Sequence, residues 1–485
     1  MKFGIKQLAS ETIIYGFSTI IGRFINWLLI PTLYVRTNAI DENGALGQIL
    51  AFMAILLVLF TFGLETGFFR FSREGKQNDV FKTSVLLLTI TSSLLIIFTF
   101  LFVPSLNNIL ADGKYLHSLY LAGIIIAIDA FLSIPFANLR LKNKAVKFAT
   151  IKLINIGLLI FFNFLFLLII PAIISKYQLS NKFVLLYNSY DNIFYIFLSN
   201  LIATISMIFF FIKDLRNIKG NFDFQIAKSM FKYCLPILIV GLTGMINQNS
   251  DRLMMPTLTE SGGLTKTGLY TINFKIGVLM SLFTQAFRYA FEPYFFKIRE
   301  KGKEGYAKIM EYFIFAGMLI FLGVTLFMDI INIIITDKYS DGNIIIPFIL
   351  IGFLFYGIYY NLSLWYKLTD KTIWAIYFGV TGMIISIALN IILVPRIGII
   401  GAALALFFGY FVMVIFSYLR GQKVFYVPYN LKRIGLYFVI GFIIYFIDKQ
   451  IFIDILLLKY LIKIFFLAIY FVVFMKIEKL LLFNK

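Results

Sequence analysis

Residues 16–33 have the sequence GFSTIIGRFINWLLIPTL, and residues 241–258 have the sequence GLTGMINQNSDRLMMPTL. The two stretches lie about 225 residues apart, and each belongs to a long apolar run. A second matching pair follows in the same order, ETGFFR at residues 65–70 and EPYFFK at residues 292–297. Two matched pairs in order indicate an internal duplication. Duplicated membrane units are typical of transporters, whose substrate path lies at the repeat interface.

The composition is that of an integral membrane protein. Of 485 residues, 60% are hydrophobic and 14% are charged, and the mean hydropathy is +0.90. About 14 apolar runs are long enough to cross a bilayer, starting near residues 12, 46, 81, 116, 151, 192, 231, 266, 309, 343, 372, 399, 434 and 453. Only helices and closed barrels satisfy the backbone in hydrocarbon, and continuous apolar runs favour helices. We therefore predict an all-α polytopic membrane protein.

The duplication divides the predicted spans into lobes. Six spans in each copy make both copies enter the membrane in the same direction, so we expect parallel repeats related by an axis along the membrane normal. The predicted units are an N-terminal lobe at residues 1–213, a C-terminal lobe at 214–420 and a helix pair at 421–485 outside the duplication.

The net charge of +20 follows topology. If both termini are cytoplasmic, the N-terminus and the inner segments hold about 31 of the 44 Lys and Arg residues; these segments are 70–82, 140–152, 213–232, 288–308, 367–371, 420–433 and 476–485. This distribution obeys the positive-inside rule and predicts both ends on the cytoplasmic side. We expect membrane lipids as partners and no nucleic acid, because no basic domain stands clear of the membrane.

Polar side chains concentrate in the two spans that match in the duplication. Arg23 and Asn26 lie in the first, and Asn247, Gln248 and Arg252 lie in the second. Ionisable groups are costly in hydrocarbon, so they tend to face a cavity or a partner. We predict a central cationic cavity carrying Arg23, Arg252 and Lys275, which suits an anionic substrate because guanidinium groups bind phosphate oxygens in a fork geometry. The alternative is structural pairing, such as Lys275 with Asp251; for Arg23 the nearest acid in sequence is Glu11, about three turns away.

Four acids are candidates for gating or ion coupling. Glu65 and Glu292 fall at matching cytoplasmic span ends, where each is either a gate or part of an interfacial anchor with the aromatic residues that follow it. Asp129 lies midway along the fourth span, where it either exchanges protons or is held by a polar neighbour. Asp251 is the fourth, beside Arg252.

Enzyme chemistry has little support in the sequence. His117 is the only histidine and Cys234 the only cysteine. A metal site would need more ligands of this kind, and no glycine-rich phosphate loop is present. We expect neither a cofactor nor a metal, and no enzymatic activity.

Three motifs resemble polysaccharide flippases of the Wzx type, in the MOP superfamily that also contains MATE exporters and the lipid II flippase MurJ. They are Glu11-Thr12-x-x-Tyr15-Gly16 through Gly22-Arg23-Phe24-x-Asn26 to Pro31; Gly63-Leu64-Glu65-Thr66-Gly67-Phe68-Phe69-Arg70-Phe71; and Asn390-x-x-Leu393-x-Pro395-Arg396-x-Gly398-x-x-Gly401-Ala402-Ala403-x-Ala405. Small residues in the third would allow close helix packing.

The resemblance implies two six-helix lobes in a V-shaped arrangement and movement of undecaprenyl-diphosphate-linked oligosaccharide from the cytoplasmic to the periplasmic leaflet of the bacterial inner membrane. It also implies polysaccharide polymerase machinery as a partner, and an arginine in the first helix of MurJ-like proteins is comparable to Arg23. Arg252 matches no motif position. The alternatives are a lipid II flippase and a MATE-like cation or drug antiporter, although the latter predicts an acidic cavity and twelve spans.

Overall fold

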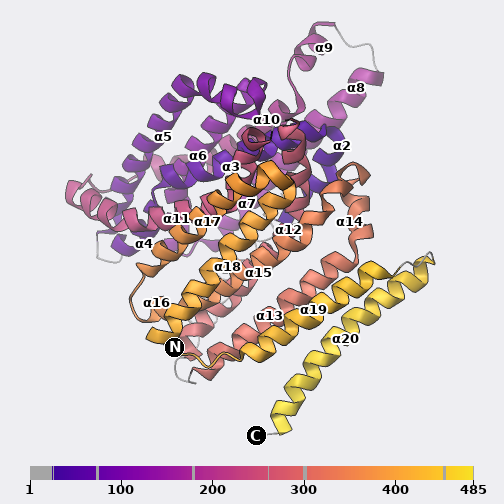
Figure 1. Cartoon of the computed structure of the whole chain (residues 1–485). Coiled ribbons are helices and arrows are strands. Elements are labelled where there is room, and N and C mark those ends of the chain that lie inside the picture. Colours follow the sequence, from indigo (N-terminus) through magenta and orange to yellow (C-terminus); the bar gives the residue numbers. More distant parts are fainter. Residues whose placement is uncertain are drawn as a thin grey trace. The chain divides into compact units, whose positions relative to one another are not determined.

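The computed structural model describes residues 24–25, 27–72, 76–176, 181–259, 261–298, 303–451 and 455–483; within these ranges, the side chains at 30, 111, 181, 289–298 and 478–483 are not described. The described residues form helices joined by short connections, with no strand among them (Figure 1). The predicted all-α class is confirmed.

The helices form two compact units, Met1–Thr271 with Asn390–Ile399, and Ile272–Leu389 with Ile400–Lys485. The first contains η1 (Ile30–Tyr34), α2 (Val35–Thr37), α3 (Ile40–Thr61), α4 (Leu64–Phe71), α5 (Gln77–Ile109), η3 (Ala111–Gly113), α6 (Leu116–Leu141), α7 (Ala145–Phe164), η4 (Leu165–Ile169), α8 (Ile170–Lys176), α9 (Asn181–Asn188), α10 (Asn192–Arg216) and α11 (Phe224–Leu258). The second contains α13 (Glu304–Leu326), α14 (Met328–Ile335), η6 (Asp337–Ile345), α15 (Ile346–Leu362), α16 (Leu364–Leu368), α18 (Ile399–Val424), α19 (Leu431–Gln450) and α20 (Leu456–Phe483). Two helices, α12 (Gly263–Ile298) and α17 (Trp374–Ile397), contribute residues to both units, and the first residue of α18, Ile399, also falls in the first unit. The lobes were predicted from the internal duplication, which this division into units does not test, so they stay a prediction.

Eleven helical segments in the described part of the chain are long and apolar enough to cross a membrane. They match eleven of the predicted spans, from the one near residue 46 to the one near residue 453. The predicted spans near 266 and 434 correspond to α12 and α19, which are of spanning length but carry more polar residues. Residues 12–23 and 26 of the first predicted span lie outside the described residues.

Close helix packing in the first unit depends on glycine. α3 lies against the start of α12, where a Cβ on Gly268 would be 1.8 Å from the carbonyl oxygen of Ile40, and one on Gly44 would be 2.0 Å from that of Leu264. Only glycine permits this approach of two backbones, as is common between membrane helices. The same unit also pairs α5 with α6, α10 with both α6 and α7, and α11 with α3.

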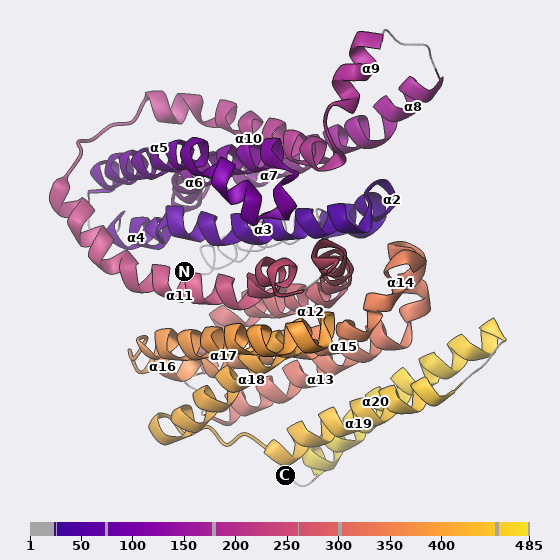
Figure 2. The ribbon, with the colours of Figure 1, turned by 45° about the horizontal axis from the view of Figure 1, so that its top comes forward.

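Side-chain caps begin three of the helices, and a long helix pair packs in the second unit. Asp191, Asp223 and Asn430 each accept a hydrogen bond from a backbone N–H in the first turn of α10, α11 and α19, respectively. In the second unit α13 contacts α15, α19 and α20, and α19 and α20 lie side by side (Figure 2). In the third motif, Ala402, Ala403 and Ala405 are fully buried.

Candidate functional site

The polar segment predicted in the second half of α11 is buried in the first unit. Asn247 and Asp251 are each 2% exposed and Arg252 is 5% exposed, whereas Gln248 is partly exposed. Because α11 is 35 residues long, a span of about 50 Å, these residues lie well beyond its start, which Asp223 caps. A buried charge of this kind needs compensation.

Arg252 is compensated by its own helix. Its Nε lies 3.5 Å from Oδ1 of Asp251, and its backbone N–H donates to the same oxygen at 2.7 Å. Its Nη2 donates to the carbonyl of Gln248 and to Oδ1 of Asn249, both at 2.8 Å. The guanidinium therefore uses several of its donors within α11, and phosphate binding by Arg252 stays a prediction.

Two partners of this segment escaped the sequence analysis. The hydroxyl of Tyr270 on α12 donates a hydrogen bond to Oδ2 of Asp251. Gln48 on α3 is fully buried, and its Nε2 donates to the carbonyl of Leu253 at 3.3 Å. An amide inside an apolar span could have been recognised as a buried hydrogen-bonding group, but its partner 205 residues away could not.

The other predicted substrate residues are placed less completely. Arg23 and Asn26 lie outside the described residues. Lys275 is half-buried on α12 in the second unit, whereas Asp251 belongs to the first unit. Both predictions for Lys275, substrate binding and pairing with Asp251, therefore stay open.

Glu65 forms an ion pair with Arg140, joining α4 to α6. The guanidinium of Arg140 also lies over the rings of Phe69 and Phe148, at 5.3 and 5.8 Å from their centroids. On the same helix as Glu65, Arg70 lies 4.4 Å from the ring centroid of Tyr233. Cations stacked on rings are what the anchor interpretation expects. The side chain of the matching Glu292 lies outside the described ones.

Asp129 on α6 is only partly accessible, and none of the described residues forms a hydrogen bond or an ion pair with it. Lys152 on α7 is its charged neighbour, and the ammonium of Lys152 lies 4.2 Å from the ring centroid of Phe136. Among the described residues no group of three or more His, Cys, Asp and Glu could hold a metal ion.

Charged residues also connect helices of the second unit. Asp329 on α14 accepts from Lys459 at 2.7 Å and from Lys463 at 3.0 Å, both on α20. Burial acts to raise the pKa of Asp329, but the two lysines outweigh it and hold that pKa below its ordinary value. Glu311 on α13 is buried, and Arg433 on α19 lies 3.6 Å from it. These pairs attach the C-terminal helix pair to α13 and α14.

Solved structures of other proteins share this fold. The inward-closed structure of the lipid II flippase MurJ aligns with a TM-score of 0.70 over 96% of this chain and 99% of MurJ, at 17% sequence identity. An inward-facing multidrug resistance transporter of the MATE family, in the MOP superfamily, aligns at 0.63 over 85% of this chain and 95% of its own, at 13% identity. A MOP superfamily transporter from Pyrococcus furiosus, described as having a binding pocket of reverse polarity, aligns at 0.53 over 85% and 96%, at 12% identity.

The chain has the MurJ–MATE fold. At these identities the likeness concerns the fold, and the chain matches no family model and no curated protein. The resemblance expected from the sequence motifs is confirmed for this fold, and the Wzx type within it stays a prediction.

Proposed function

We propose that the protein is a transporter of the inner membrane that moves an undecaprenyl-diphosphate-linked oligosaccharide from the cytoplasmic to the periplasmic leaflet by alternating access, for the synthesis of cell-surface polysaccharide. The three sequence motifs favour this substrate, and the extent of the fold match supports a transporter of this kind. MurJ aligns with 96% of the chain and the MATE transporter with 85%.

The proposed binding residues divide by charge. Arg23 and Lys275 bind the diphosphate: the guanidinium of Arg23 offers phosphate a fork of donors, and the ammonium of Lys275 is a compact cation. Asn26, Asn247 and Gln248 offer hydrogen bonds to sugar hydroxyls. The contacts of Arg252 with Asp251 favour a role for this arginine in holding the polar segment of α11 in shape.

A lipid II flippase is the second candidate, and the alignment with MurJ over nearly the full length of both chains favours it. Both candidates involve a diphosphate carried on a long lipid, so the same cations would serve either substrate. The two functions can be told apart by which flippase-deficient bacteria the protein complements.

Complementation tests both candidates. The gene is expressed in bacteria lacking their oligosaccharide flippase and, separately, in bacteria depleted of their lipid II flippase. Wild type is compared with Arg23→Ala, Lys275→Ala and a matched control, Lys182→Ala, an exposed lysine on α9. Surface polysaccharide is measured in the first strain and growth in the second, with membrane insertion checked by immunoblot.

The proposal predicts that wild type and the control restore surface polysaccharide, and that Arg23→Ala and Lys275→Ala insert normally but do not. Growth restored only in the second strain would support the lipid II candidate instead. Export by both alanine variants at the wild-type level would overturn the assignment of these cations. Failure of wild type in both strains would overturn flipping of either substrate.

A further inference from the structure

The connection between α18 and α19 carries positive charge without any acid. No Asp or Glu occurs between Asp370 and Asp448, a stretch that includes the cations Arg420, Lys423, Lys432 and Arg433. Arg433 is paired with Glu311. Arg420, Lys423 and Lys432 are exposed, and none of them has an acidic partner among the described residues.

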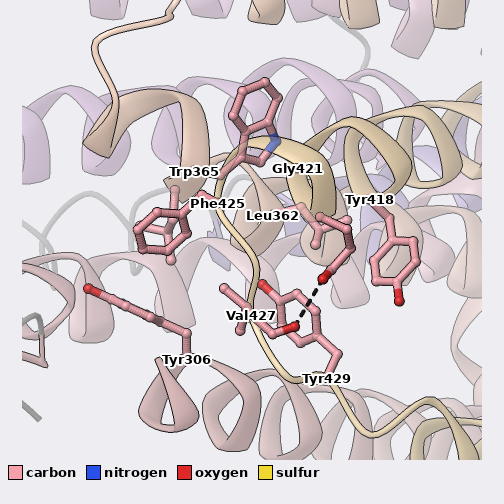
Figure 3. A pocket seen from close by; sticks show the side chains of 10 residues that line it. Tyr306, Leu362, Trp365, Tyr418, Gly421, Phe425, Val427 and Tyr429 are labelled. Atoms are coloured by element: carbon pink, nitrogen blue, oxygen red, sulfur yellow. Dashed lines mark hydrogen bonds between the residues drawn. The ribbon is translucent and has the colours of Figure 1, made fainter. Parts of the chain in front are cut away.

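These three cations lie on either side of a short non-helical segment, Arg420 and Lys423 before it and Lys432 after it. Residues 425–430, here called the strap, have no helical structure and cross from the end of α18 to Asn430, which caps α19. Nε2 of Gln422 donates to the carbonyl of Val427 at 3.0 Å, and Val427 is buried (Figure 3). Under the strap lies a cavity of about 10 Å³, about the size of one water, so a larger ligand can reach only the outer face.

Rings, apolar side chains and cations occur together on the strap and on the helices beside it. Tyr426, next to the buried Val427 in the chain, is 62% exposed, and Leu419 and Leu431 are 53% and 55% exposed on the flanking helices. Arg420 lies 4.7 Å from the ring centroid of Trp374, and Lys303 lies 4.6 Å from that of Phe425. Tyr and Trp rings beside Lys and Arg are typical of the boundary between hydrocarbon and headgroups.

We propose that the strap and the flanking ends of α18 and α19 form a binding surface for an anionic phospholipid. Arg420, Lys423 and Lys432 contact the headgroup phosphate, while Tyr426, Leu419 and Leu431 lie against the upper acyl chains. The exposed apolar side chains favour a lipid over free phosphate, since free phosphate would leave them in water. The positive-inside distribution puts this surface on the cytoplasmic leaflet, where anionic lipids attract basic segments. This inference depends on neither the substrate nor the direction of transport.

Lipid retention tests the proposal. The full-length protein is purified in an uncharged detergent and mixed with phosphatidylglycerol, phosphatidylcholine or inorganic phosphate, and bound lipid is counted by native mass spectrometry. We expect the Arg420→Gln, Lys423→Gln, Lys432→Gln triple variant to bind phosphatidylglycerol at least about tenfold more weakly than wild type, because each cation near a membrane surface contributes separately. Phosphatidylcholine binding should not change.

The chain offers a charge-matched control on the same predicted face. Lys213, Arg216 and Lys219 are exposed near the end of α10, and their triple Gln variant removes the same charge. We expect this control to bind phosphatidylglycerol like wild type, and the reverse exchange Arg420→Lys, Lys423→Arg, Lys432→Arg to retain binding. Equal loss in both Gln triples would overturn the proposal, since binding would then follow net charge. Inorganic phosphate that displaces phosphatidylglycerol at millimolar concentration would also overturn it.

Discussion

Lys463, in the first third of α20, lies 3.0 Å from the carboxylate of Asp329 on α14, 134 residues earlier in the chain. Lys463 is 6% exposed. The carboxylate of Asp329 forms ion pairs with both Lys463 and Lys459. A lysine inside an apolar helix is tolerated when a partner neutralises it. The pair therefore attaches the last helix to the body of the second unit.

We expect Lys463→Met to lower stability by about 1–2 kcal/mol, because Asp329 keeps Lys459 while losing one of two charge-assisted hydrogen bonds. Thermal unfolding of the purified protein in detergent measures this. Lys476→Met, at an exposed lysine of the same helix, is the matched control and should change stability by less than about 0.5 kcal/mol. Equal effects of the two variants would contradict a specific pair.

The same carboxylate predicts a pH dependence. Its pKa in the folded protein lies below the ordinary value of 3.8, because the two lysines outweigh burial. A carboxyl with a depressed folded-state pKa contributes stability that is complete above its unfolded pKa and is lost as the pH falls through its folded pKa. The stability difference between wild type and Asp329→Asn should be constant above about pH 5 and shrink below about pH 4. Unfolding of both proteins from neutral to acidic pH checks this, and a difference that grows on acidification would refute it.

Removing one member of the α11 ion pair should be more damaging than removing both. Asp251→Ala leaves the guanidinium of Arg252, which is 5% exposed, without its carboxylate. We expect a loss of about 3–5 kcal/mol, which can prevent folding. The double variant Asp251→Asn, Arg252→Met removes both charges and should recover much of that loss. Yield of monodisperse protein and thermal midpoint measure both, and a double variant worse than the single one would contradict the pairing.

The contact between α3 and α12 makes Gly268 sensitive to a single methyl group. Gly268→Ala places a Cβ 1.8 Å from the carbonyl oxygen of Ile40, so the helices must separate. We expect a loss of at least about 1–3 kcal/mol, as for other overpacked positions. Gly157→Ala is the control, because a Cβ there meets nothing within 4 Å. That change should be neutral or stabilising by up to about 1 kcal/mol, since alanine favours the helix. Similar thermal midpoints for the two variants would rule out the close contact.

Substitution of Glu65, which pairs with Arg140, distinguishes the anchor interpretation from the gate interpretation. Both side chains are partly exposed, at 40% and 33%, so we expect Glu65→Gln to change stability by less than about 1 kcal/mol. With the anchor interpretation, transport by Glu65→Gln in the complementation assay stays near the wild-type level. Loss of transport at unchanged stability and insertion would favour a gate at this position.

Sequence reasoning worked best where the physics is local. A membrane helix satisfies its own backbone, so its existence can be read from about 20 consecutive apolar residues. For this reason the spans beginning near residues 81, 116 and 192 coincide with α5, α6 and α10. The span predicted near residue 266 likewise coincides with α12, which is 36 residues long although Asn273 and Lys275 make it more polar.

By itself the sequence determined the helical class, the order of the spans, the expected orientation and the places where charge enters the membrane. Only the tertiary structure decided what those charges contact. Asp251 accepts from Tyr270 on the next helix, and Lys463 reaches an acid 134 residues away. The physical reason is that hydropathy is a sum over neighbours along one helix, whereas pairing depends on which helix faces meet after packing. An unpaired charge in hydrocarbon is costly, so the fold has to supply partners that no local pattern identifies.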